Sequence, residues 1–90
     1  MNDDIRDELL ELRRYVRTDV EHVREGINAI IRRLGTVYRG YAEHNDARAI
    51  RYSRWVMMLS IGLEYIQVHP QCLEGYLDGI AFEMTLRDQI

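Results

Sequence analysis

Residues 4–42 read DIRDELLELRRYVRTDVEHVREGINAIIRRLGTVYRGYA, and this stretch decides the fold because its apolar residues recur every three or four positions. Such spacing is a heptad seam, here with one four-residue insertion between Val16 and Val20. It predicts a single helix over 4–42, roughly 58 Å long at ~1.5 Å per residue. The seam consists of Ile5, Leu9, Leu12, Val16, Val20, Val23, Ile27, Ile30, Leu34, Val37 and Tyr41.

A rod of this length is too long for the rest of the chain to cover. A compact chain of 90 residues is only roughly 30 Å across. We therefore expect a homodimer, an intertwined helical bundle in which a second copy buries the first part of the seam. The predicted dimer interface consists of Ile5, Leu9, Leu12, Val16 and Val20.

The junction between Val16 and Val20 allows an alternative. Thr18 and Glu21 have the spacing of a capping box, which marks the start of a helix. No Gly or Pro lies at the junction, so the prediction favours a continuous helix over a break.

The second half of the chain predicts two shorter helices and a turn. Residues 43–46, EHND, form a polar cluster typical of a turn between antiparallel helices. A helix over 47–68 follows, with Asn45 or Asp46 as its cap, and His69-Pro70 ends it. A third helix covers 70–88, and no internal repeat is apparent. The sequence thus predicts a single all-α domain of three helices.

The helix over 47–68 carries apolar residues on more than one face. This pattern predicts a central helix that is buried on two sides. One seam consists of Tyr52, Val56, Leu59, Leu63 and Ile66, and the other of Met58, Ile61, Tyr65 and Val68.

Composition bounds the class of protein. Hydrophobic residues make up 47% of the chain, with one Pro and the single cysteine Cys72. A lone cysteine gives no disulfide framework, which favours a reducing cytoplasm. The acidic start MNDDIRDE is unlike an export signal, and no apolar run approaches the ~18 residues of a membrane span. We expect a cytoplasmic protein that does not enter a membrane.

The net charge of −3 conceals a segregation. Residues 1–12 and 55–90 each carry five acidic residues against one Arg, whereas residues 13–54 carry ten Arg against five acidic residues. All 12 basic residues are Arg. A GC-rich genome explains a lysine-free chain, but the guanidinium fork also suits anionic or interface partners.

The predicted turn brings six arginines and several aromatic residues to one end of the molecule. Such a tip could neutralise phosphates while its aromatic rings stack on bases. The alternative places the aromatic residues in the core and leaves the Arg side chains in solvent or paired with acidic residues. The candidate binding residues are Arg39, Arg48, Arg51, Arg54, Tyr38 and Trp55.

Metal and nucleophile patterns are weak. His69 and Cys72 offer two ligands without a second pair, and no third group would activate Cys72 as a nucleophile. We therefore predict no catalytic residue, no metal site and no cofactor.

The layout of a very long, a middle and a shorter helix resembles the all-helical chorismate mutases. Residues 9–13, LLELR, are similar to that family's start, and Thr85 and Gln89 to its terminal pair. The resemblance implies an intertwined dimer with a cofactor-free, Arg-rich pocket for a dicarboxylate, to which Arg13, Arg32 and Arg48 would contribute. Ala42 and Ala49 stand where the family has Lys and Glu.

The favoured prediction is a small cytoplasmic interaction protein that is not an enzyme, such as a regulator, an adaptor, a chaperone or a phage-type inhibitor. It would bind a protein partner through helical surfaces and the Arg/Tyr tip. A chorismate-mutase-like enzyme or degenerate relative, and a nucleic-acid-binding helical dimer, are the alternatives.

Overall fold

The computed structural model describes the backbone of residues 2–88 and the side chains of residues 3–86. The chain is all-α, and the described part contains no strand. Its four helices are α1 (Asn2–Arg13), α2 (Val20–Glu43), α3 (Arg48–Tyr65) and α4 (Pro70–Asp88). They form a bundle with a Cα radius of gyration of 12.9 Å and principal extents of 41 × 23 × 17 Å.

The prediction of one continuous helix over 4–42 is wrong, because the chain turns at residues 14–19. Asp19 is the N-cap of α2, and its side chain accepts a hydrogen bond of 3.1 Å from the backbone N–H of His22. An Asp at this position satisfies an otherwise unpaired N–H group. The break predicted as the alternative is therefore present, with Asp19 rather than Thr18 as the cap.

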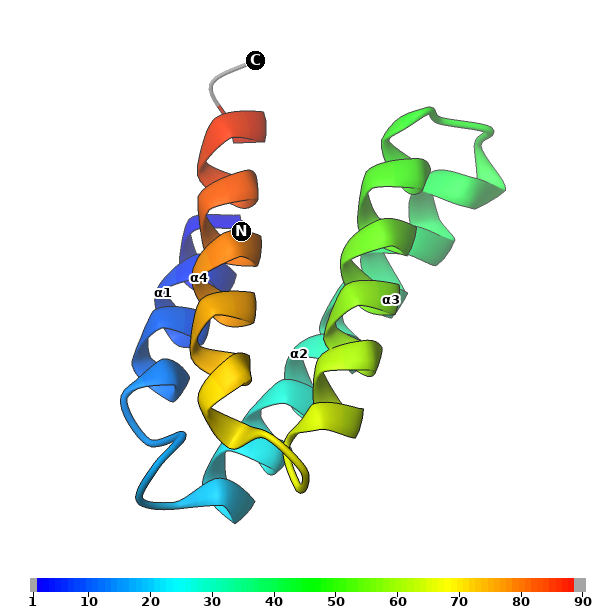
Figure 1. Ribbon diagram of the computed structural model, residues 1–90. Coiled ribbons are helices and arrows are strands. Elements are labelled where there is room, and N and C mark those ends of the chain that lie inside the picture. Colours follow the sequence, from blue (N-terminus) through cyan, green and yellow to red (C-terminus); the bar gives the residue numbers. More distant parts are fainter. Residues whose placement is uncertain (1, 89–90) are drawn as a thin grey trace.

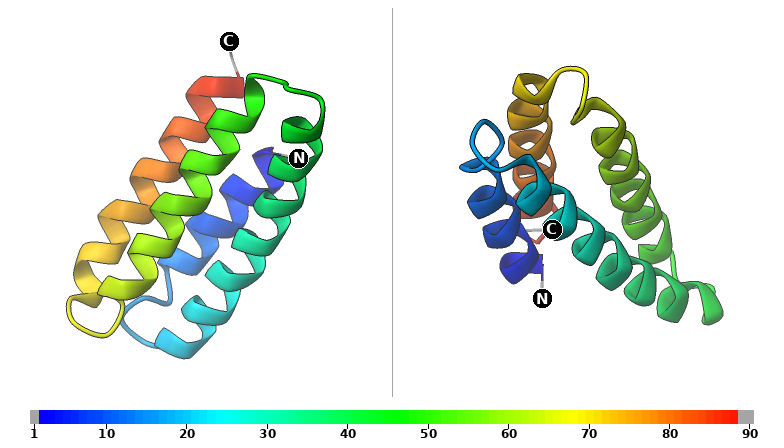
Figure 2. Two further views of the ribbon diagram at one scale, coloured as in Figure 1. Left: turned by 90° about the vertical axis from the view of Figure 1, so that its right-hand side faces the viewer. Right: turned by 90° about the horizontal axis from the view of Figure 1, so that it is seen from below.

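The four helices pack as two pairs. α1 lies alongside α4, and α2 lies alongside α3, while contacts between α1 and α2 and between α3 and α4 are less extensive (Figures 1 and 2). The loops after α1 and after α3 lie at one end of the bundle, and the turn between α2 and α3 lies at the other (Figure 1).

This packing covers the predicted dimer interface within a single chain. Ile5, Leu9, Leu12 and Val16 are at most 6% exposed, and Val20 is partly buried against the core. The break lets α1 pack against α4, so the seam that was expected to need a second copy is covered by the chain's own helices. The premise of an uncovered rod is wrong.

The chain is an internal repeat of two helical hairpins, which the sequence did not reveal. The first hairpin is α1–α2, the second is α3–α4, and the positions correspond at a shift of 50 residues, as in Tyr15 and Tyr65. Asp19 N donates to the carbonyl of Tyr15 at 2.8 Å, and His69 N donates to that of Tyr65 at 2.8 Å. The next bond in each loop, from Thr18 N or Val68 N to the same carbonyl, is 3.1 Å in both.

The core follows the same repeat. Apart from Leu12, whose counterpart is Gly62, each large core residue of the first hairpin has a core counterpart in the second, and all of these are at most 2% exposed. These residues all belong to one cluster of buried side chains, so the two hairpins bury one continuous core. The pairs are Ile5/Trp55, Leu9/Leu59, Val16/Ile66, Val23/Leu73, Ile27/Leu77, Ile30/Ile80 and Leu34/Met84.

One matched pair of contacts exchanges a small and a large residue. In the first hairpin Gly26 faces Leu12, whose Cδ2 would lie 2.5 Å from a Cβ at position 26. In the second hairpin the glycine is Gly62, at the position of Leu12. A Cβ there would lie 3.2 Å from Leu73 Cδ1 and 3.5 Å from Cδ1 of Tyr76, which stands at the position of Gly26. Each hairpin thus holds one glycine where the two helices approach.

Candidate interaction surface

The turn between α2 and α3 is held by its own charged residues. The Asp46 carboxylate accepts bonds from the backbone N–H of Arg48 at 2.9 Å and from its guanidinium at 2.6 Å. These side-chain and backbone hydrogen bonds lower the pKa of Asp46 to about 2. The Arg48 guanidinium also lies 4.4 Å from the ring centroid of Tyr41. Arg48, a predicted binding residue, therefore stabilises the turn.

The other predicted tip residues have different environments. Arg39 is exposed and donates to the Thr36 hydroxyl, and Tyr38 is 37% exposed. The Arg51 side chain has no hydrogen-bond or ion-pair partner among the described residues. The assignment of Trp55 to a binding surface is wrong, because Trp55 is 0% exposed. Its ring packs against that of Tyr52, with 5.1 Å between the ring centroids.

The arginines singled out by the chorismate mutase resemblance lie in separate places. The Nε of Arg13 donates to Asp78 at 2.7 Å, across the contact between α1 and α4. Arg48 is bound to Asp46, and Arg32 lines an open groove between α2 and α3. Thr85 accepts a bond of 3.4 Å from Arg6, and Gln89 lies outside the described residues.

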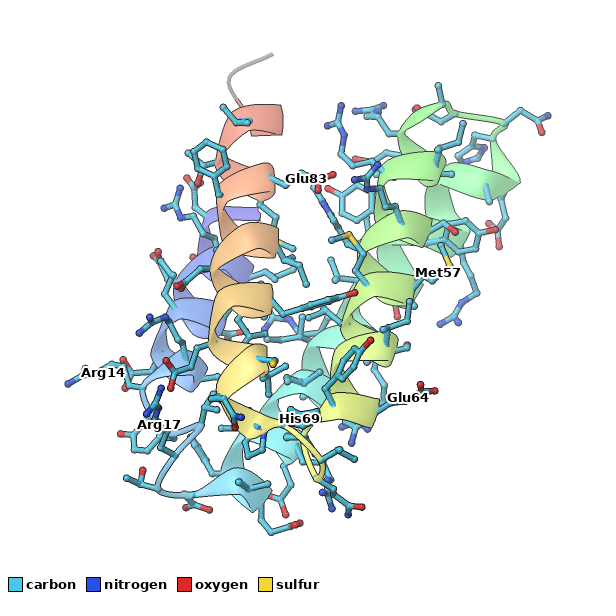
Figure 3. The ribbon with its side chains drawn as sticks, viewed as in Figure 1. Arg14, Arg17, Met57, Glu64, His69 and Glu83 are labelled. Carbon is cyan, nitrogen blue, oxygen red and sulfur yellow. The ribbon has the colours of Figure 1, made fainter. Side chains whose placement is uncertain are left out.

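The outer side of α3 carries a second heptad seam that faces away from the core. We call these residues the outer seam: Ile50, Arg54, Met57, Ile61, Glu64 and Val68, spaced alternately by four and three residues. Ile50 is 75% exposed, Met57 58%, Ile61 38% and Val68 67%. In Figure 3, Met57 and Glu64 both project from the side of α3 opposite to α4.

The prediction of a helix buried on two sides holds only in part: α3 contacts both α2 and α4, and Met58 of its second predicted seam is partly buried against the core. Tyr52, Leu59 and Ile66, from the first of its predicted seams, are buried, whereas Ile61 and Val68 from the second are exposed. The outer seam is long enough to contact a partner helix along all of α3, which has 18 residues and so spans about 27 Å.

The repeat supplies an internal reference for this surface. At the corresponding positions of the first hairpin, every residue is polar: Asp4, Asp7, Glu11, Arg14 and Thr18. On α4, Phe82 is 64% exposed and Leu86 44%, while their counterparts on α2 are Arg32 and Thr36. Two hairpins with matching cores thus differ at these exposed positions, which are charged or polar in the first hairpin and mostly apolar in the second.

Charged residues at corresponding positions also differ in sign. Arg33 on α2 binds Glu8 on α1, whereas its counterpart Glu83 on α4 binds Arg54 on α3, with 3.3 Å between Nε and Oε1. Glu83 points from α4 toward α3 in Figure 3. Arg54 and Glu83 also line a hollow with Ile50 and Arg51, so two members of the outer seam, Ile50 and Arg54, border it.

Comparison of the chain with models of protein families, with curated proteins and with solved structures gives no match. Among the described residues, no cluster of three or more His, Cys, Asp and Glu has the arrangement needed to hold a metal ion. None of the described helices combines the length and apolar character needed to cross a membrane.

The outer seam was missed in the sequence because its charged members interrupt it. Arg54 and Glu64 hide the alternating spacing of Ile50, Met57, Ile61 and Val68 when only apolar residues are counted. A heptad count that admits one charged residue of each sign would have found it.

Proposed function

We propose that the chain is an interaction protein, a small cytoplasmic regulator or adaptor rather than an enzyme, whose binding surface is the outer seam of α3. The supporting observation is the contrast between the hairpins. Apolar residues occupy the exposed positions of α3 and α4 whose counterparts on α1 and α2 are charged or polar. Because the two cores match, folding does not require this difference, and binding gives it a reason.

The chemistry of the seam fits a protein partner. Met57 near its middle has a flexible, polarisable side chain that adapts to a partner's surface. Arg51, which lines a hollow with Ile50 and Arg54 of the seam, would contribute polar contacts at the rim, where Arg is common in interfaces.

Affinity capture with matched variants tests the proposal. The tagged chain, its Met57→Glu variant and its Asp7→Ala variant, changed at the corresponding position of α1, are used as baits against their own cells' extract and against a purified, untagged copy of the chain. We expect the wild type and Asp7→Ala to retain a stoichiometric protein, identified by mass spectrometry, and Met57→Glu to lose it. Equal retention by all three baits, or no stoichiometric protein in either sample, would reject the proposal.

The two alternative functions stay predictions, each with a direct test. Nucleic-acid binding through the tip would weaken steeply with salt and on changing Arg39 and Arg51 to Glu. A chorismate-mutase-like activity would consume the absorbance of chorismate when the protein is added.

A further inference from the structure

We infer that the partner of the outer seam is a second copy of this chain, with the two α3 helices antiparallel about a two-fold axis near Leu59. This inference rests on the proposed function and names its partner. It follows from the order of residues in the seam and from their exposure.

The seam's spacing indicates a helix as the occupant. Its members alternate by four and three residues, the spacing with which two helices pack knobs into holes. Val68 lies just beyond the end of α3. Ile66, the residue that follows the helix, keeps helical backbone angles, with φ −60° and ψ −30°. The Val68 side chain, in the turn that follows α3, is 67% exposed.

The seam is self-complementary when it is read in opposite directions. In an antiparallel pair centred near Leu59, Ile50 of one copy faces Val68 of the other, and Met57 faces Ile61. In the remaining pair of facing positions, Arg54 of one copy faces Glu64 of the other. Each apolar residue thus meets an apolar residue, and each charged residue meets the opposite charge.

The same charges exclude the parallel arrangement. There, Arg54 would face Arg54 of the other copy and Glu64 would face Glu64, and like charges across an interface are unfavourable. A charged residue within an otherwise apolar seam fixes register and orientation in this way.

Glu64 supplies independent support. It is exposed and has no ion-pair or hydrogen-bond partner among the described residues. Its counterpart in the first hairpin, Arg14, is bound to Glu11 at 3.3 Å. Arg54 already contacts Glu83, and its five N–H donors allow a second carboxylate. The second copy supplies the cation that Glu64 lacks within its own chain.

The first test is the mass of the purified full chain in solution. Sedimentation equilibrium at micromolar concentration is expected to give twice the chain mass of 10.7 kDa. Met57→Glu and Glu64→Arg should each raise the dimer dissociation constant at least about tenfold, because each places a charge against an apolar or like-charged layer. Arg14→Glu, the matched charge reversal on α1, should leave the dimer intact. Far-UV circular dichroism checks that each variant remains helical.

The second test fixes the orientation by disulfide formation. In a background with Cys72→Ser, the Ile50→Cys and Val68→Cys variants are oxidised separately and as a mixture. Only the mixture should give a crosslinked dimer, since in the antiparallel pair two copies of residue 50 are about 27 Å apart, beyond the ~7 Å limit between bridged Cα atoms.

The outcomes separate this inference from the proposed function. A single-copy mass throughout, a dimer that survives both Met57→Glu and Glu64→Arg, or crosslinking of Ile50→Cys with itself would overturn the inference. If the chain is a single copy but Met57→Glu still abolishes capture of another protein, the proposed function stands and only the second copy is rejected.

Discussion

The two hairpins have matching interiors and different exteriors. α1–α2 and α3–α4 share their loop hydrogen bonds and their core positions. Their outer faces differ, with Asp7 and Glu11 on α1 where α3 has Met57 and Ile61. The comparison teaches that the exposed positions of one repeat can change while its core positions keep the same burial. Exposed apolar residues are common on any protein. An apolar surface on one hairpin is therefore best compared with the corresponding positions of the other hairpin.

The largest expected effect is on the shared core. Leu9→Ala and Leu59→Ala each remove a side chain that is at most 1% exposed, and each should lower the free energy of unfolding by about 2–5 kcal/mol. Urea denaturation at one fixed protein concentration measures both. A loss in one variant alone would break the equivalence of the two cores.

The glycines should give effects of opposite sign. Gly26→Ala places a Cβ 2.5 Å from Leu12 and should destabilise the fold by about 1–3 kcal/mol through overpacking. Gly79 has nothing within 4 Å, and its counterpart is Ala29, so Gly79→Ala should stabilise by about 0.5–1 kcal/mol.

Thermal denaturation compares the two glycine variants. Leu12→Val, which shortens the residue that Gly26 faces, should recover part of the loss in Gly26→Ala. Changes of the same sign at positions 26 and 79 would contradict the packing difference.

The helix starts after the two loops should also respond differently. Asp19 caps α2 through His22 N, so Asp19→Ala should cost about 0.5–2 kcal/mol. His69, the counterpart before α4, has no side-chain hydrogen bond among the described residues and precedes Pro70, which has no N–H to cap. His69→Ala should change stability by less than about 0.5 kcal/mol. Equal losses would show that the caps are equivalent after all.

The smallest effect concerns the turn that joins the hairpins. Asp46 has a pKa of about 2 because of its bonds from Arg48, below the ~3.9 of an unfolded Asp. Its contribution to stability is therefore complete above about pH 4 and is lost as the pH falls toward 2. NMR titration should show the low pKa in the wild type and a value nearer 4 in Arg48→Ala. An unchanged pKa would remove Arg48 as its cause.

The arginine tip was predicted in part. The sequence placed Arg39, Arg48 and Arg51 at one end of the molecule, and the structure has them beside the α2–α3 turn. It could not assign their partners, because the Asp46 carboxylate reaches Arg48 only in the geometry of the folded turn.

The repeat escaped the sequence because few paired positions are identical. Leu9/Leu59, Tyr15/Tyr65 and Ile30/Ile80 are the identical pairs over residues 1–40 and 51–90. Leu12 and Gly62 even differ in the direction opposite to their partners Gly26 and Tyr76. Similarity of this kind resides in burial and in loop hydrogen bonds, which single letters do not encode.

By itself, the sequence determined the helical class and most of the core, because apolar residues at intervals of three and four favour one face of a helix. Only the tertiary structure decided where the first helix ends, and which apolar face of α3 is covered. Periodicity shows that a face is apolar but not which element lies against it. That depends on the turn at residues 14–19, which sends α1 to α4 and leaves Ile50, Met57 and Ile61 on the outside.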